Sequence, residues 1–133
     1  MADDRSEKHI LCIEDDPEMI AMIRLILRRR DYAVEGAEGG QAGLQAVRKS
    51  HPDLILLDLM MPDMDGWDVY QRIKADPATR EIPVIIVTAR AQNIDRVMGL
   101  QIAKVDDYIV KPFSPRQLLE SVERVLKAGT TAG

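Results

Sequence analysis

The chain has 133 residues, of which 46% are hydrophobic and 30% charged, and its formal net charge is −4 at pH 7. This length fits one domain, and the composition excludes a disordered or collagen-like chain. The acidic balance argues against direct contact with nucleic acid. No apolar run reaches the roughly 18 residues of a membrane span, and the charged start MADDRSEK predicts no secretory signal. The single cysteine, Cys12, suits a reducing compartment, so we expect a cytoplasmic domain without membrane contact.

Apolar runs of strand length alternate with segments of helical period along the chain. Residues 9–13, 54–57 and 84–87 are continuous apolar runs, as is typical of strands buried on both faces of a parallel sheet. Residues 32–35 and 107–110 are weaker strand candidates. We expect residues 1–7 to be disordered, residues 8–128 to form the domain, and residues 129–133 to form a flexible tail or the start of a linker.

The segments between these runs predict helices. In the first, Asp16 is a capping carboxylate before Pro17, and the arginines at 28–30 complement the helix dipole in the last turn. Ser114 and Gln117 form the pattern of a capping box at the start of the last helix. The other helices are predicted from apolar spacing, at Leu44 and Val47, at Val69, Tyr70 and Ile73, and at Ile94, Val97, Met98 and Ile102. The alternation of strands and helices predicts a doubly wound α/β sandwich of three layers.

In such a sheet the functional crevice lies at the carboxyl ends of the strands. The residues that follow the predicted strands are acidic, hydroxylic or basic: Glu14, Asp15, Asp16, Asp58, Thr88 and Lys111. Three carboxylates and one lysine leave a charge that a divalent cation cancels, and an all-oxygen ligand set favours Mg²⁺. The capping role is sufficient to explain Asp16.

A carboxylate beside a metal, a lysine and a threonine can accept a phosphoryl group, because the metal and the lysine neutralise the phosphoryl oxygens. The chain has no GxxxxGK[ST] loop, so we expect the donor to be another molecule. A magnesium-dependent hydrolase is the enzymatic alternative. Phosphatases of the haloacid-dehalogenase type place their acid/base, an aspartate, two residues after the nucleophile, where this chain has Met60, so the resemblance to that family is incomplete.

Four motifs resemble the receiver (response-regulator) domain of bacterial two-component signalling: residues 13–16 (IEDD), 57–66 (LDLMMPDMDG), 87–89 (VTA) and 108–113 (YIVKPF). The intervals from Asp58 to Thr88 and from Thr88 to Lys111 also match. The resemblance covers residues 8–128. It implies a five-stranded parallel sheet of order 2-1-3-4-5 in a flavodoxin-like, CheY-like fold.

The resemblance also implies a role for each site residue. Asp58 would be the phosphoacceptor, with Thr88 and Lys111 contacting the phosphoryl group. Mg²⁺ would be held by Glu14, Asp15, Asp58 and the backbone carbonyl of Met60. Thr88 and Tyr108 would form the conformational switch, although Tyr108 can also be read as a packing residue. Lys111 and Pro112 would be joined by a cis peptide bond.

Two departures from the family pattern stand out. The segment 101–105 (QIAKV) is longer by one residue than the usual stretch and has no glycine, so we expect the fourth helix or its exit loop to be unusual. In receivers of winged-helix transcription factors, an arginine pairs with an aspartate across a dimer. Here the aspartate is Asp107, but Ser121 stands at the arginine position, which does not support that dimer.

We therefore predict a phosphorylation-dependent signalling switch rather than an enzyme, with at most self-phosphorylation and self-dephosphorylation. Its partners would be a sensor histidine kinase or phosphotransfer protein and a downstream output domain or protein. It would be a monomer or a weak phosphorylation-dependent dimer. The alternative that stays open is a receiver-fold interaction module that works without phosphorylation.

Overall fold

A five-stranded parallel sheet forms the centre of the computed structural model, which describes residues 7–89 and 105–132. The strand order is β2-β1-β3-β4-β5, which confirms the predicted doubly wound sheet. The strands are β1 (His9–Ile13), β2 (Ala33–Ala37), β3 (Leu54–Asp58), β4 (Val84–Thr88) and β5 (Asp107–Val110). The described helices are α1 (Pro17–Arg28), α2 (Gly40–Ser50), α3 (Gly66–Ala75) and α5 (Pro115–Ala132).

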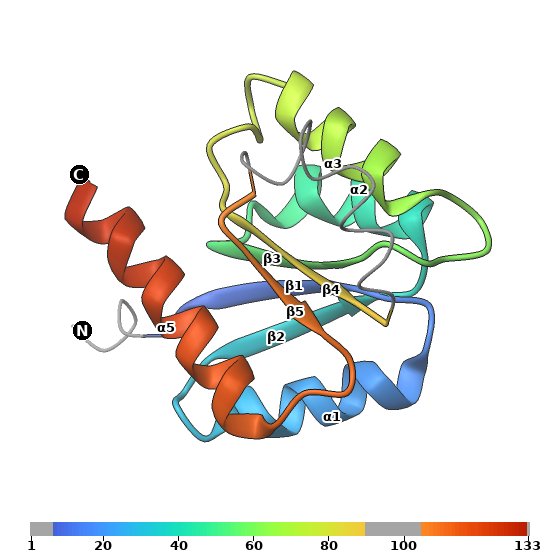
Figure 1. Ribbon diagram of the computed structural model, residues 1–133. Coiled ribbons are helices and arrows are strands. Elements are labelled where there is room, and N and C mark those ends of the chain that lie inside the picture. The colour runs from blue at the N-terminus through green and yellow to red at the C-terminus, as the bar shows by residue number, and fades with distance from the viewer. Residues whose placement is uncertain (1–6, 90–104, 133) are drawn as a thin grey trace.

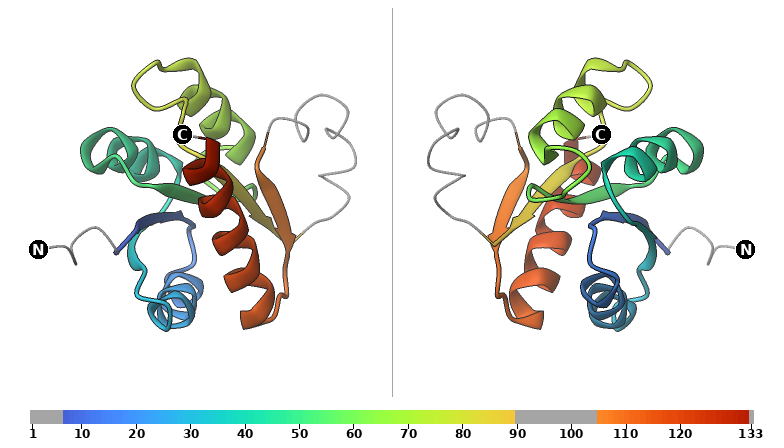
Figure 2. Two further views of the ribbon diagram at one scale, coloured as in Figure 1. Left: turned by 90° about the vertical axis from the view of Figure 1, so that its left-hand side faces the viewer. Right: turned by 90° about the vertical axis from the view of Figure 1, so that its right-hand side faces the viewer.

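The helices cover both faces of the sheet, α1 and α5 on one side and α2 and α3 on the other (Figures 1 and 2). Two hydrophobic cores result. Along β1, Ile10 and Cys12 pack toward α1 and α5, whereas Leu11 and Ile13 pack toward α2 and α3. Every second side chain of a strand points to the same face, so burial of both faces requires the continuous apolar runs seen in the sequence.

The predicted helix starts at Asp16 and Ser114 are confirmed by their hydrogen bonds. The Asp16 carboxylate accepts from the backbone N–H of Glu18 at 2.9 Å. The capping box of α5 is reciprocal: Ser114 N–H donates to Gln117 Oε1 at 2.9 Å, and Gln117 N–H donates to Ser114 Oγ at 3.1 Å. These bonds satisfy amide groups that have no partner within their own helix.

Two boundaries differ from the predicted ones. β2 extends to Ala37 rather than ending at Glu35, and Glu14 N–H donates to Ala37 O beyond the last residue of β1. β2 lies at the sheet edge and is mostly half-buried, so its apolar signal is weak. α5 continues through residues 129–132, although the small residues there predict a flexible tail. The division of the chain into a disordered start, a domain and a tail stays a prediction.

The fourth predicted helix, around residues 94–102, and residues 101–104 of the glycine-free segment lie outside the described residues. Among the helices that the structure describes, none has both the length and the apolar character of a membrane span.

Candidate functional site

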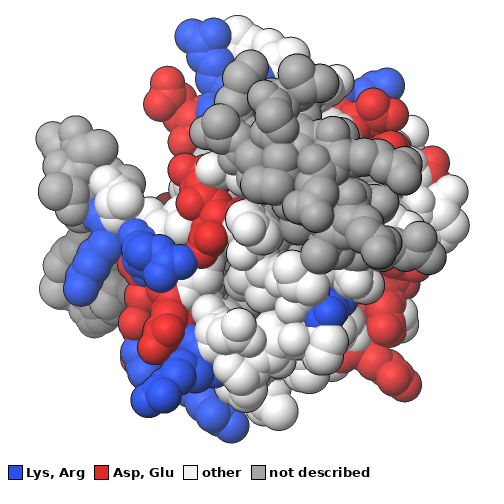
Figure 3. Space-filling view, viewed as in Figure 1, with Lys and Arg blue, Asp and Glu red and all other residues white. Residues whose placement is uncertain are grey.

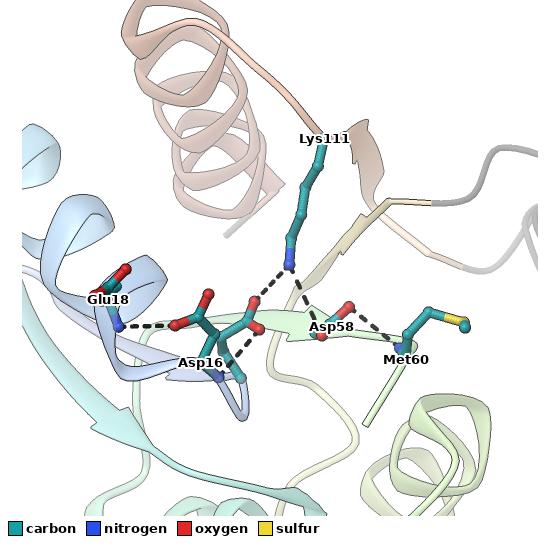
Figure 4. A network of polar contacts seen from close by, with 6 residues as sticks. Asp16, Glu18, Asp58, Met60 and Lys111 are labelled. Atoms are coloured by element: carbon teal, nitrogen blue, oxygen red, sulfur yellow. Dashed lines mark hydrogen bonds and ion pairs between the residues drawn. The ribbon is translucent and has the colours of Figure 1, made fainter. Parts of the chain in front are cut away.

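The predicted site residues gather at the carboxyl edge of the sheet, as the strand topology requires. Glu14 and Asp15 follow β1, Asp58 is the last residue of β3, and Lys111 follows β5. The register pairs Ile13 with Leu57, so the ends of β1 and β3 lie side by side. Figure 4 shows the Lys111 side chain reaching from the end of β5 toward Asp58.

Three carboxylates share one small volume. Oxygen atoms of Glu14, Asp15 and Asp58 all lie within 4.8 Å of one another. Glu14 and Asp58 are only 3% and 4% exposed. The three anions repel each other, and the two buried ones also lose hydration, so a cation among them would relieve both costs. The all-oxygen composition and the spacing fit a hard divalent ion such as Mg²⁺.

Lys111 places a positive charge beside the carboxylates of Glu14 and Asp58. Its Nζ donates to Glu14 Oε1 at 2.8 Å and lies 3.8 Å from Asp58 Oδ2. Its position is fixed through the main chain as well, because Lys111 N–H donates to the carbonyl of Thr88 at 2.8 Å. The lysine thus bridges the carboxylates of two strands from a third.

The electrostatics of the cluster favour uptake of positive charge. The pKa of Glu14 is raised to about 7, mainly by burial and also by the charge of Asp58, against the lowering effect of the Lys111 hydrogen bond. Burial also raises the pKa of Asp58, although the Met60 amide and Lys111 oppose it. The pKa of Lys111 is raised: burial alone would lower it, but the Glu14 hydrogen bond and the Asp58 charge outweigh that effect.

The Asp58 carboxylate is oriented by the loop that follows it. Met60 N–H donates to Asp58 Oδ1 at 3.2 Å. Gly66 N–H donates to Leu59 O at 3.1 Å, and a Cβ at Gly66 would lie only 2.5 Å from the Asp58 carbonyl oxygen. Glycine is therefore required where α3 begins, because the loop folds back directly onto the end of β3.

The structure places Thr88 and Tyr108 on neighbouring strands. Thr88 is fully buried at the end of β4, one residue beyond the partner of Asp58 in the register. Tyr108 pairs with Ile86, so Tyr108 and Thr88 point to the same face of the sheet. Tyr108 is 42% exposed. The expected cis bond between Lys111 and Pro112 is present.

Two contacts near the site were not predicted from the sequence. Asp107 Oδ2 accepts from Ser121 Oγ at 2.5 Å and from the guanidinium of Arg124, both on α5. Arg124 lies one helical turn after Ser121, a spacing that could have indicated it. Asp63 accepts hydrogen bonds from the start of α2, a long-range contact for which the sequence carries no local signal.

Comparison with known proteins gives one consistent result. The family model described as "Response regulator receiver domain" matches residues 10–123. The transcriptional regulatory protein ResD of Bacillus subtilis is 40% identical over 94% of this chain and 50% of its own length. The signal receiver domain of a putative LuxO repressor protein from Vibrio parahaemolyticus has a TM-score of 0.85 at 30% identity, covering 95% of each chain. A CheY-like receiver domain protein from Methanospirillum hungatei has a TM-score of 0.84 at 32% identity, covering 96% of this chain and all of its own.

The chain spans about half the length of the curated relatives that it matches. The likeness to the solved receiver domains, in contrast, covers nearly the whole of both chains.

Proposed function

Because this chain belongs to the response regulator receiver domain family, we propose that it is a signalling switch in which Asp58 accepts a phosphoryl group. The observation that carries the proposal is the grouping of Glu14, Asp15 and Asp58 around the ammonium of Lys111. A receiver-fold module that works without phosphorylation would have no need of two buried carboxylates, Glu14 and Asp58, whose pKa values are raised chiefly by burial.

In the proposed reaction, a carboxylate oxygen of Asp58 attacks the phosphorus of a phosphohistidine on a histidine kinase or phosphotransfer protein. A phosphorus–oxygen bond forms, the phosphorus–nitrogen bond breaks, and its electron pair stays on the imidazole nitrogen. The product is an acyl phosphate on Asp58. Attack by water on that phosphorus returns the carboxylate and releases inorganic phosphate, so the chain itself carries out at most phosphorylation and dephosphorylation of its own side chain.

The residues around Asp58 fit the needs of this transfer. The Met60 amide fixes one oxygen of the nucleophile. Lys111 Nζ, already 3.8 Å from the other oxygen, would leave Glu14 and pair with a phosphoryl oxygen. The Thr88 hydroxyl would donate to a second oxygen. Mg²⁺ held by Glu14, Asp15, Asp58 and the Met60 carbonyl would supply the remaining positive charge.

The proposed readout of phosphorylation is a change at β5. New contacts of Thr88 and Lys111 with the phosphoryl group would favour a conformation in which the exposed Tyr108 ring moves inward. An output domain or protein would respond to that surface; one relative is named as a transcriptional regulatory protein. We propose that residues 8–128 form the receiver unit, and that it is a monomer or a weak phosphorylation-dependent dimer. Within the chain, Asp107 is already engaged by Ser121 and Arg124.

Direct nucleic-acid contact is not part of the proposal. On the face seen in Figure 3, basic side chains lie among acidic ones along α5 instead of forming a continuous basic surface. Two arginines are themselves paired with carboxylates of or beside α5, Arg30 with Glu123 and Arg124 with Asp107.

Phosphorylation can be tested directly. The chain is incubated with a small acyl phosphate donor and Mg²⁺, and its intact mass is measured. We expect a gain of one phosphoryl group in the wild type, and no gain in the presence of a chelator or in Asp58→Asn. The control Asp53→Asn, at the amino end of β3, should gain the phosphoryl group as the wild type does. The absence of a gain in the wild type, or an undiminished gain in Asp58→Asn, would contradict the proposal.

A further inference from the structure

The start of α2 is capped by a residue from a different loop. The residue before the helix, Gly39, has no side chain, and its φ of +109° is one that other residues rarely adopt. The first two amides of the helix donate instead to Asp63: Gly40 N–H to Oδ1 at 3.0 Å and Gln41 N–H to Oδ2 at 3.2 Å. Both oxygens of one carboxylate therefore satisfy amides that have no partner within the helix.

The packing around this cap is close. A Cβ at Gly40 would lie 2.7 Å from Cβ of Met64, so the missing side chain lets α2 approach the loop between β3 and α3. The two hydrogen bonds also lower the pKa of Asp63, which keeps the carboxylate charged beside the positive end of the helix.

The capped loop is the one that carries Met60. Only Met61 and Pro62 separate Met60 from Asp63, and both limit the movement of the main chain: Met61 is buried in the core, and the ring of Pro62 fixes its φ. At its other end the loop is held by the bond from Met60 N–H to Asp58. A shift of Asp63 would therefore be passed to the Met60 carbonyl.

We propose that Asp63 is a positioning residue: by capping α2, it holds the Met60 carbonyl in place for Mg²⁺ and so sets the affinity of the site. This inference rests on the proposed function, because it takes Met60 as a ligand. Coupling between two sites is reciprocal, so Mg²⁺ at Asp58 must in turn strengthen the bonds from Gly40 and Gln41 to Asp63.

The experiment is a Mg²⁺ titration followed by NMR and by Trp67 fluorescence in the wild type and three variants. Asp63→Ala removes both acceptors, and we expect it to weaken Mg²⁺ binding about fivefold. Asp63→Asn removes the charge but keeps one acceptor, so its loss should be smaller. Glu38→Gln, which removes a negative charge from the neighbouring exposed loop, is the matched charge control and should bind as the wild type does.

A second measurement needs no variant. In the wild type, saturating Mg²⁺ should slow hydrogen exchange at the Gly40 and Gln41 amides, and this readout does not depend on phosphorylation. Wild-type affinity in Asp63→Ala, an equal loss in Glu38→Gln, or unchanged exchange at both amides would overturn the inference while leaving the metal site intact. A wild type that does not respond to Mg²⁺ would overturn the proposed metal site itself.

Discussion

Lys111 and Glu14, from opposite ends of the chain, form a 2.8 Å ion pair in which the side chains are 16% and 3% exposed. The pair joins the end of β5 to the end of β1 across the intervening strands β3 and β4. The cluster around the pair is not neutral, because the carboxylates of Asp15 and Asp58 lie close to that of Glu14. Lys111 therefore balances only part of the negative charge of the cluster.

Replacing Lys111 tests this arrangement. Lys111→Met should destabilise the metal-free chain by about 3 kcal/mol at pH 8, because it leaves buried carboxylates without their cation. Urea denaturation in the presence of a chelator measures the loss, and Mg²⁺ should recover part of it. Lys49→Met, at an exposed position on α2, is the control and should change stability little. A Lys111→Met variant as stable as the wild type would show that the lysine charge does not stabilise the buried carboxylates.

The stability of the metal-free chain should depend on pH because of Glu14. Its pKa is about 7 in the fold against an ordinary value of 4.5, so the folded state holds a proton that the unfolded state releases. The contribution of Glu14 to the free energy of unfolding is then greatest below about pH 4.5. It falls as the pH rises toward 7, by about 3 kcal/mol in all. The raised pKa of Asp58 acts in the same direction.

Chemical denaturation between pH 5 and pH 8 checks this dependence. Glu14→Gln should make the curve flatter, whereas Glu120→Gln, exposed on α5, should leave it unchanged. Stability that increases across this range in the wild type would be the opposite of the expected sign.

Gly66→Ala should damage both the fold and the site. The new Cβ would lie 2.5 Å from the Asp58 carbonyl oxygen and from Leu59 Cα, and backbone atoms cannot move aside as the end of a side chain can. We expect a loss of about 2 kcal/mol or more, together with weaker phosphorylation of Asp58. Thermal unfolding and the intact-mass measurement check the two effects. Gln71→Ala, exposed on the same helix, should be close to neutral in both, and a neutral Gly66→Ala would contradict the close approach.

Removing the capping box should cost stability alone. Ser114→Ala leaves an amide in the first turn of α5 without its partner and should destabilise the chain by about 1 kcal/mol. Because Gln117 and Ser114 cap each other, Ser114→Ala with Gln117→Ala should lose less than the sum of the single changes. Urea denaturation of the three variants measures this, and strictly additive losses would show that the two bonds are independent.

The sequence was sufficient to predict the parts of the fold that are set by local pattern. β1, β3 and β4 have both faces buried, so their apolar runs are continuous and their ends fall where Glu14, Asp58 and Thr88 begin the site. β2 was placed less well, because an edge strand has less apolar side chain to bury.

Contacts between distant segments could not be predicted in this way. The capping of α2 by Asp63 and the ion pair between Arg124 and Asp107 depend on which segments of the chain meet in space. The Asp63 cap leaves no periodic signal, and the helical spacing of Arg124 from Ser121 indicates the contact with Asp107 only once the position of Asp107 beside α5 is known. The pairing of Lys111 with Glu14 was implied only as a shared location, and its hydrogen bond is a finding of the structure.

The register of the parallel sheet has one more consequence. Glu14, Asp15, Asp58, Thr88 and Lys111 each end a strand or follow one, so the pairings Ile13–Leu57, Asp58–Val87 and Thr88–Val110 determine how far each strand end projects. Deleting one residue within β3 would withdraw Asp58 by about 3.3 Å and turn it to the other side of the sheet. Changes of length in the turns at the amino ends of the strands would leave that projection unaltered. The chain can therefore vary in those turns while the relative positions of the site residues stay the same.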